Sequence, residues 1–340
     1  MEGLVVSLDR GYPLVRTERG EERAQHAIDL VKNVDMRAAV GDFVELSREL
    51  GQDTMYISAI KPRTTVLARR ELVESIHDGA GKMKEQVLAA NFDFAAAVQS
   101  LGKKPLDLTY LERQLVMAHE SGAEAIVLLT KADEARHLTE DFEAAKAVAP
   151  GCRVVCLSKM DDPTELRGLF VSGAGVGGGD EAGASTGGGT SGGTGTSTSG
   201  DTGANANASA GRLGVLLGRS GVGKSTLVNL LAGEERQATG SVRAKDNAGR
   251  HTTVARRLVE LPSGGAVIDT PGMRAIGVLG AKTGLAQTFP EIATVAGECQ
   301  FRDCSHTHEP GCAVVARVEA GDIPERRLVS YRELAAEVFD

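Results

Sequence analysis

The sequence lacks the features that would place the protein in or across a membrane. No run of about 18 or more apolar residues occurs, so no transmembrane helix is expected. The N-terminal residues contain no basic segment followed by an apolar core, so no secretory signal is predicted and we expect a cytoplasmic protein with no membrane partner. A formal net charge of -8 likewise gives no whole-molecule argument for binding nucleic acid.

Cysteine is also scarce, with 5 residues in a chain of 340. Thiols stay reduced in the cytoplasm, which favours metal binding over disulfides. Four potential metal ligands fall within one short span, namely Cys299, Cys304, His306 and Cys312. Three thiolates and one imidazole suit one structural Zn²⁺ ion per chain, and four protein ligands leave no open position for catalysis. His308 is an alternative to His306, whereas Cys152 and Cys156 fit a buried strand as small apolar residues.

A chain of this length can form two or three domains, and its pattern predicts three. Residues 1–72 alternate apolar and polar side chains between turn signals, which predicts a small all-β barrel. From residue 86 to Ile268, apolar strands alternate with amphipathic helices, which predicts a mostly parallel sheet covered by helices. Residues 71–84 are expected to form a connector, and 87–90 the first buried strand of this α/β domain.

The α/β domain is expected to span 73–290 and to be interrupted at 172–211. That segment consists almost entirely of Gly, Ser, Thr, Ala and Asn, and it cannot bury enough apolar surface to offset the entropy lost on ordering. It is predicted to be a disordered insert, since no motif supports the alternative of a binding tail. Residues 291–340 form the third predicted domain, which contains the cysteine cluster and ends in a helix over 325–338.

One segment of the α/β domain fits the phosphate-loop pattern G-x-x-x-x-G-K-[ST]. It comprises Gly218, Arg219, Ser220, Gly221, Val222, Gly223, Lys224, Ser225 and Thr226. A predicted buried strand precedes it and a predicted helix follows, the context in which backbone N–H groups bind phosphate oxygens. Lys224 is expected to reach the β- and γ-phosphates and Ser225 to bind Mg²⁺. The alternative, a glycine-rich turn between strand and helix, is weakened by the presence of both the lysine and the serine.

Two further segments fit the Mg²⁺ and γ-phosphate contacts of such a site. The predicted strand 266–268 ends in Asp269, which can bind Mg²⁺ through water, and the backbone N–H of Gly272 can approach the γ-phosphate. Thr252 and Thr253 lie between the phosphate loop and Asp269, where GTPases have a mobile switch that senses Mg²⁺ and the γ-phosphate. The respective alternatives are an ordinary strand-ending turn and a solvated polar loop.

A base-reading segment precedes the phosphate loop in the chain. Thr130, Lys131 and Asp133 follow a predicted strand and resemble the GTPase motif Asn-Lys-x-Asp, with Thr in the place of Asn. Asp133 can accept two hydrogen bonds from guanine, an arrangement that adenine would leave partly unpaired, and Lys131 can lie over the base. Ser158 occupies the place of the short second guanine-contacting loop. Taken alone, these segments are also compatible with charged loops that follow strands. Their position before Gly218 in the chain indicates a circularly permuted GTPase order. Such a permutation is reasonable because the two ends of a domain often lie close together.

Together these features resemble the RsgA-type family of ribosome small-subunit-dependent GTPases over nearly the whole chain. The resemblance rests on the permuted order, the predicted barrel, the cysteine cluster and the segments 40–44, 61–63, 90–93, 249–253, 269–272 and 309–312. It implies an oligonucleotide-binding (OB) barrel, a circularly permuted P-loop GTPase domain and a small zinc-binding helical domain. It also implies a monomer that binds the small ribosomal subunit and its rRNA, and hydrolyses GTP to GDP with stimulation by the subunit during its late maturation.

Two further expectations concern catalysis and RNA contact. Met273 stands where many GTPases have a water-orienting Gln, so slow intrinsic hydrolysis is predicted. The resemblance indicates His251 as the catalytic residue, with a solvated switch residue as the alternative. Two basic clusters can meet RNA phosphates, with solvated faces as the alternative for both. They are Arg63, Arg69 and Arg70 near the end of the predicted barrel domain, and Arg326, Arg327 and Arg332 in the last helix. A P-loop kinase or ATPase and a nucleotide-gated scaffold with little hydrolysis are the competing functions.

Overall fold

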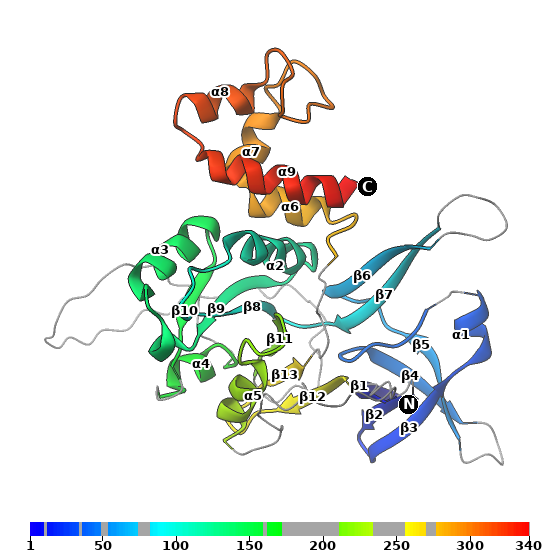
Figure 1. Ribbon diagram of the computed structural model, residues 1–340. Helices are drawn as coiled ribbons and strands as arrows, with labels where there is room; N and C mark the ends of the chain where they lie inside the picture. The colour runs from blue at the N-terminus through cyan, green and yellow to red at the C-terminus, as the bar shows by residue number, and fades with distance from the viewer. Residues whose placement is uncertain are drawn as a thin grey trace, which may run out of the picture.

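The computed structural model describes most of the chain in three structural parts (Figure 1). The described residues are 1–9, 12–33, 36–48, 54–73, 82–158, 162–171, 211–233, 256–269 and 277–339. An N-terminal β-barrel, a central α/β sheet and a C-terminal group of helices follow one another along these residues. This architecture confirms the predicted fold class. No helix in the described ranges combines the length and apolar character needed to cross a membrane.

The barrel is formed by short strands with a helix beside them. Its elements are β1 (Glu2–Asp9), β2 (Tyr12–Thr17), β3 (Gly20–His26), α1 (Ile28–Asn33), β4 (Phe43–Arg48) and β5 (Met55–Ile60). The strands pair in the order β1-β2-β3-β5-β4, and β4 pairs again with β1. Closure of this kind leaves no free sheet edge. Val5, Val15, Val44 and Ile57 are fully buried inside, as alternation of side chains along each strand requires.

After the barrel, β6 (Val66–Val73) and β7 (Lys82–Ala90) pair with each other as an antiparallel ribbon. The expectation of a connector over 71–84 is therefore wrong, because residues at both of its ends belong to these strands. Residues 87–90 do form a buried strand, but it pairs with β6 and not with the α/β sheet. The apolar character that suggested a sheet core arises because Leu67, Leu88 and Ala89 pack in the same core cluster as helix α2.

The central sheet combines parallel strands from both halves of the chain. Its strands are β8 (Phe94–Ser100), β9 (Glu124–Thr130), β10 (Arg153–Cys156), β11 (Leu213–Leu217), β12 (Arg256–Glu260) and β13 (Ala266–Asp269). The order is β10-β9-β8-β11-β13-β12, with only β12 antiparallel to its neighbour among these described strands. β12 also pairs with β1, so the sheet continues into the barrel.

Helices cover both faces of this sheet. They are α2 (Leu108–Glu120), the 3₁₀ turn η1 (Ala132–Glu134), α3 (Leu138–Val148), α4 (Thr164–Gly168) and α5 (Lys224–Ala232). Ala95 and Ala97 of β8 pack in one cluster with α2 and α3, whereas Phe94, Ala96 and Val98 pack in another with α4 and α5. Figure 1 shows α2 and α3 on one side of the sheet and α4 and α5 on the other. Burial on both faces is what a parallel sheet requires.

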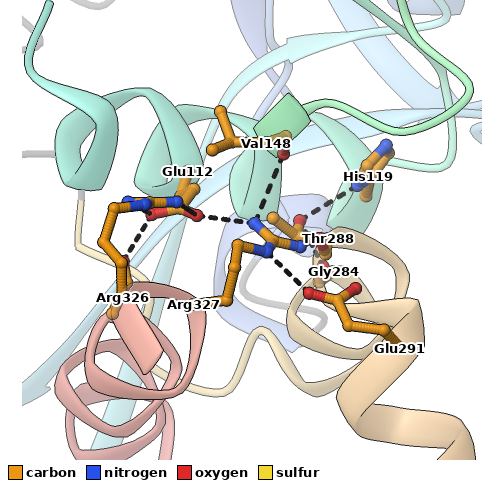
Figure 2. Close-up of polar contacts among 9 residues, drawn as sticks. Glu112, His119, Val148, Gly284, Thr288, Glu291, Arg326 and Arg327 are labelled. Atoms are coloured by element: carbon orange, nitrogen blue, oxygen red, sulfur yellow. Dashed lines mark hydrogen bonds and ion pairs between the residues drawn. The ribbon is translucent and has the colours of Figure 1, made fainter. Parts of the chain in front are cut away.

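The C-terminal unit consists of α6 (Lys282–Thr288), α7 (Pro290–Ala296), α8 (Ala313–Glu319) and α9 (Glu325–Phe339). A buried ion-pair network joins it to α2, as Figure 2 shows. Glu112 of α2 is 0% exposed, and its carboxylate accepts hydrogen bonds from Arg326 at 2.6 Å and from Arg327 at 2.5 Å. Arg327 also donates to Glu291 at 2.6 Å. This network ties α9 and α7 to the central domain.

These contacts change the interpretation of the basic cluster in the last helix. Arg326 and Arg327 are paired with Glu112, and a guanidinium nitrogen of Arg332 donates to the backbone carbonyl of His306. These side chains therefore have partners within the protein, while the side chain of Arg326 stays 39% exposed. Their partners lie far away in the sequence, so neighbouring residues gave no sign of this structural role.

Candidate functional site: a phosphate loop and a base-reading edge

The phosphate loop lies between β11, which ends at Leu217, and α5, which begins at Lys224. Gly221 and Gly223 have φ angles of 85° and 99°, a left-handed conformation that glycine adopts without strain. A Cβ atom at Gly218 would lie 2.7 Å from the carbonyl oxygen of Val98, so only glycine fits there. These positions explain the glycines of the motif, because the turn must stay tight for its N–H groups to converge.

Lys224 is held against the loop by the loop's own backbone. Its Nζ donates to the carbonyl oxygens of Gly218 at 2.7 Å and Arg219 at 2.9 Å. Burial lowers the pKa of Lys224, and the charge of Asp269 partly opposes this effect. The ammonium and the carboxylate therefore belong to one electrostatic site at the ends of β11 and β13. A phosphate is a stronger acceptor than a neutral carbonyl and can take over the ammonium's hydrogen bonds.

The carboxyl ends of the neighbouring parallel strands bring the predicted nucleotide residues to one edge of the sheet. Thr130 ends β9, Lys131 follows with a left-handed φ of 58°, and Asp133 lies in η1. The backbone N–H of Ala132 donates to the carbonyl of Leu157 at 3.1 Å, which places Ser158 beside this turn. The two predicted guanine-contacting segments are therefore adjacent, and β8 separates them from the phosphate loop on β11.

Thr130 has a different setting from Lys131 and Asp133. Its hydroxyl is buried, and it lies 2.6 Å from the carbonyl oxygen of Val222 in the phosphate loop. It also lies 3.2 Å from the carbonyl oxygen of Gln99. The side chain predicted to contact the nucleotide therefore contacts the loop backbone in this structure.

Several predicted residues lie outside the described part of the chain. They are His251, Thr252, Thr253, Gly272 and Met273, together with most of the 172–211 insert. The other predicted nucleotide residues lie within the described part of the chain, at the carboxyl-end edge of the central sheet. They are Gly218 to Thr226, Thr130 to Asp133, Ser158 and Asp269. The roles of the switch residues remain predictions.

Two of the arginines predicted to contact RNA, Arg63 and Arg70, form ion pairs within the protein. Arg63 forms two hydrogen bonds of 2.7 Å with Asp42, whose side chain is fully buried. Arg70 pairs with Glu85 at 2.7 Å and with Glu120 at 3.4 Å, and the hydrogen bond to Glu85 raises its pKa. Arg63 therefore compensates the charge of Asp42, which would be costly to leave buried without a partner.

A candidate metal centre lies in the C-terminal unit. Its members are Cys299, Cys304, His306 and Cys312, whose ligand atoms all lie within 4.8 Å of one another. Nδ1 of His306 is 3.6 Å from Sγ of Cys299 and 3.5 Å from Sγ of Cys312. Burial lowers the pKa of His306, which favours the neutral imidazole that binds metal. His308 is not part of this group, and its Nδ1 contacts Thr307 instead.

Residues that the sequence did not reveal hold this loop in shape. Glu309 accepts hydrogen bonds from the backbone N–H groups of Ser305 and Thr307, at 2.8 Å and 2.9 Å. His306 has a left-handed φ of 58°, and its carbonyl accepts from Arg332 of α9. The group is therefore fixed both by its own loop and by the last helix. A cysteine pattern identifies ligands, whereas such supporting contacts depend on the folded loop.

The fold and this edge of the sheet define a P-loop nucleotide-binding protein whose base-reading strand precedes its phosphate-binding strand in the chain. The family described as RsgA GTPase matches residues 60–171 and 196–279. The chain belongs to the RsgA GTPase family of circularly permuted GTPases, and it is a GTP hydrolase.

Individual relatives extend this match beyond the GTPase domain. A small ribosomal subunit biogenesis GTPase RsgA from Streptomyces avermitilis is 38% identical over 99% of this chain and 79% of its own length. The crystal structure of YjeQ from Thermotoga maritima has a TM-score of 0.61 at 20% identity, covering 99% of this chain and 98% of that one. YloQ, a circularly permuted GTPase, has a TM-score of 0.59 at 22% identity, covering 99% and 94%. These two structures show a shared fold.

Proposed function

We propose that this protein binds the small ribosomal subunit and assists its late maturation, and that the subunit stimulates its hydrolysis of GTP to GDP and phosphate. The main support is the extent of the similarity to the Streptomyces avermitilis protein, which is named for small-subunit biogenesis and matches 99% of this chain. That match includes the barrel and the metal-binding unit, whereas a GTPase domain alone would not imply a ribosomal partner. The protein would act in the cytoplasm as a monomer.

In this proposal the phosphate loop binds the nucleotide through its backbone N–H groups from Gly218 to Thr226. Lys224 contacts the β- and γ-phosphates, while Ser225 and Asp269 hold Mg²⁺, directly and through water respectively. Asp133 accepts the hydrogen bonds of guanine, with Lys131 over the base and Ser158 beside it. Thr252, Thr253 and Gly272 would complete the γ-phosphate contacts.

Zinc is the metal that suits the C-terminal group. For a tetrahedral ion with Zn–S of about 2.3 Å and Zn–N of about 2.05 Å, ligand atoms would be about 3.5 Å apart for N and S and about 3.8 Å apart for S and S. The distances from His306 to Cys299 and Cys312 are 3.6 Å and 3.5 Å, and the two sulfurs lie 4.0 Å apart. The residues therefore fit one structural Zn²⁺, which would stabilise the loop between α7 and α8 and leave no open catalytic position.

For rRNA contact, we propose the three arginines Arg63, Arg69 and Arg70, of which Arg69 has an exposed side chain. An Arg–phosphate contact releases counterions from RNA, so binding should weaken as salt increases. Replacing Arg69 with Gln should weaken subunit binding and reduce its salt dependence. Affinity that is independent of ionic strength would contradict a phosphate contact.

The decisive experiment measures GTP turnover with and without purified small subunits. We expect slow turnover alone and faster turnover with subunits, and no comparable turnover of ATP. Asp133→Asn tests base recognition in the same assay. It keeps the shape of the side chain but removes one acceptor for guanine, so the affinity for GTP should fall. Subunit binding without any gain in turnover would favour a nucleotide-gated scaffold, and equal use of ATP would favour another class of P-loop enzyme.

The catalytic assignment of His251 is tested in the same assay. His251→Ala should abolish most of the subunit-stimulated turnover while GTP binding and subunit binding stay unchanged, because a general base acts only on the attacking water. His137→Ala provides a control at a described histidine that precedes α3. Full stimulated turnover in His251→Ala would remove His251 from catalysis without affecting the proposed ribosomal role.

A further inference from the structure

A buried polar network lies beneath the phosphate loop and comes from three different elements. Gln99 of β8, Gln114 of α2 and Thr130 at the end of β9 are 6%, 0% and 5% exposed. Burying an amide or hydroxyl costs free energy unless its hydrogen bonds are satisfied. Their hydrogen-bond partners therefore indicate what these polar side chains do in an otherwise apolar core.

Gln114 holds the point where β11 passes into the phosphate loop. Its Nε2 donates to the carbonyl oxygen of Leu217, the last residue of β11, at 2.8 Å, and lies 3.3 Å from the carbonyl oxygen of Val98. Its Oε1 accepts from Nε2 of Gln99 at 2.7 Å. Gln99 thereby fixes the orientation of the Gln114 amide, with the N–H groups directed at the two strands.

Thr130 holds the other end of the same loop. Its hydroxyl donates to the carbonyl oxygen of Val222 at 2.6 Å, one residue before Gly223. The approach is close, because a Cβ atom at Gly223 would lie 3.3 Å from the Thr130 hydroxyl oxygen. The loop is therefore tied to buried side chains both before Gly218 and before Gly223.

We propose that Gln114 and Thr130 are positioning residues for nucleotide binding, and that Gln99 acts through Gln114. They hold the loop backbone so that its N–H groups already converge when phosphate arrives, which lowers the entropic cost of binding. Thr130 therefore acts on the phosphate side of the nucleotide, although it stands in the base-reading motif. The inference depends on the proposed binding of guanine nucleotide at this loop.

The Thr130 test compares GDP with inosine diphosphate, which lacks the exocyclic amino group of guanine. Thr130→Val keeps the shape of the side chain and removes the hydroxyl, so the dissociation constant for GDP should increase about fivefold. The constant for inosine diphosphate should increase by the same factor, since the base is not involved. Thr130→Ser retains the hydroxyl and should bind like the wild type. A changed preference between the two nucleotides would overturn the phosphate-side role.

A matched control separates positioning from general stability. Thr288 is also fully buried, and its hydroxyl donates to the carbonyl of Gly284 at 2.8 Å in the C-terminal unit. Thr130→Val and Thr288→Val should both lower the thermal midpoint of the nucleotide-free protein, but Thr288→Val should leave GDP affinity unchanged. Equal losses of GDP affinity in the two variants would mean that the hydroxyl of Thr130 only supports the fold, and would overturn the proposal.

The two glutamines provide an independent test by a double-mutant cycle. Gln114→Leu should weaken GDP binding about fivefold, and Gln99→Leu should weaken it in the wild type but hardly at all in the Gln114→Leu protein. Equal effects of Gln99→Leu in both backgrounds would show that it does not act through Gln114. If these variants do not fold, the Thr130 variants decide. Absence of GDP binding by the wild type refutes the proposed function, whereas wild-type binding by Thr130→Val and Gln114→Leu refutes only this inference.

Discussion

A buried carboxylate, Glu112, lies in the joint between the central domain and the C-terminal unit, and its removal should be costly. Glu112 is 0% exposed and accepts hydrogen bonds from Arg326 and Arg327 of α9 (Figure 2). It also accepts a hydrogen bond from the hydroxyl of Ser330 in the same helix. Glu112→Gln keeps the size of the side chain but removes its charge. The guanidinium of Arg327, whose side chain is 5% exposed, would then retain only the partly exposed Glu291 as an ion-pair partner among the described residues.

The size of the effect follows from burial. Breaking a buried ion pair by removing one partner costs about 3–5 kcal/mol, since it leaves an uncompensated charge. Because Glu291 still pairs with Arg327, we expect Glu112→Gln to lose about 3 kcal/mol of unfolding free energy. Replacing both Glu112 and Arg327 with Leu should recover much of this loss, because no buried charge then remains without a partner.

Another ion pair between the same two helices provides the matched control. Arg113 of α2 pairs with Glu337 of α9, and the side chain of Glu337 is 42% exposed. Glu337→Gln should therefore cost less than about 1 kcal/mol. Urea unfolding of the full chain, followed by far-ultraviolet circular dichroism, compares both variants with the wild type. The reasoning is refuted if Glu112→Gln loses no more stability than Glu337→Gln.

Three further predictions concern the nucleotide site, the barrel and the metal centre. Lys224→Ala should weaken GTP binding at least tenfold, measured by titration calorimetry, because a charge-assisted hydrogen bond contributes about 1.5–3 kcal/mol; unchanged affinity would exclude a phosphate contact. Burial lowers the pKa of His26 below its ordinary 6.5, and its Nε2 accepts from the N–H of Ala38. Below a pH of about 6.5 the unfolded chain therefore binds a proton that the folded chain does not, so the stability of the fold should decrease as pH falls. His26→Gln should reduce this dependence of the thermal midpoint on pH, measured in thermal melts. His306→Ala should lose the bound zinc and lower the thermal midpoint, whereas His308→Ala should retain one zinc per chain by metal analysis.

Motifs that act through neighbouring residues were predictable from the sequence. The phosphate loop, the turn at Thr130 to Asp133 and the cysteine cluster each concentrate their chemistry in a few consecutive positions. Parallel strands then bring the first two to one sheet edge, outside the carboxyl ends of the strands, where ligands of open α/β sheets bind. The alternation of strands and helices likewise predicted the central sheet and its covered faces.

The first strand of that sheet was not predicted, and its composition explains why. β8 contains the run Ala95 to Ala97, and alanine has a low strand propensity and a high helix propensity. The strand forms because its side chains are buried on both faces, against α2 on one side and α5 on the other. Tertiary packing therefore determines this strand. The sequence pattern instead indicated the adjacent apolar run 87–90 as the first strand of the sheet.

Side-chain roles that depend on distant partners were also inaccessible. Arg63 belongs to a local basic cluster, but its partner Asp42 is 21 residues away and fully buried. Gln114 belongs to an amphipathic helix, and the carbonyl it binds at Leu217 is 103 residues away. In both cases the hydrogen-bond partner follows from burial, because a polar group removed from water needs a partner and only the folded structure decides which one is near.

The late position of the phosphate loop has a structural explanation at the permutation junction. Val171 and Gly211 form an antiparallel bridge, so the residues that flank the insert lie side by side. A Cβ atom at Gly211 would lie 1.9 Å from the backbone nitrogen of Gly265, which requires glycine there and fixes the re-entry of the chain beside β13. With both ends fixed, doubling the length of the intervening segment would cost only about 0.6 kcal/mol of loop entropy. The length of the insert is therefore uncoupled from the geometry of β11, and the phosphate loop keeps its place between β8 and β13 however far along the chain it falls.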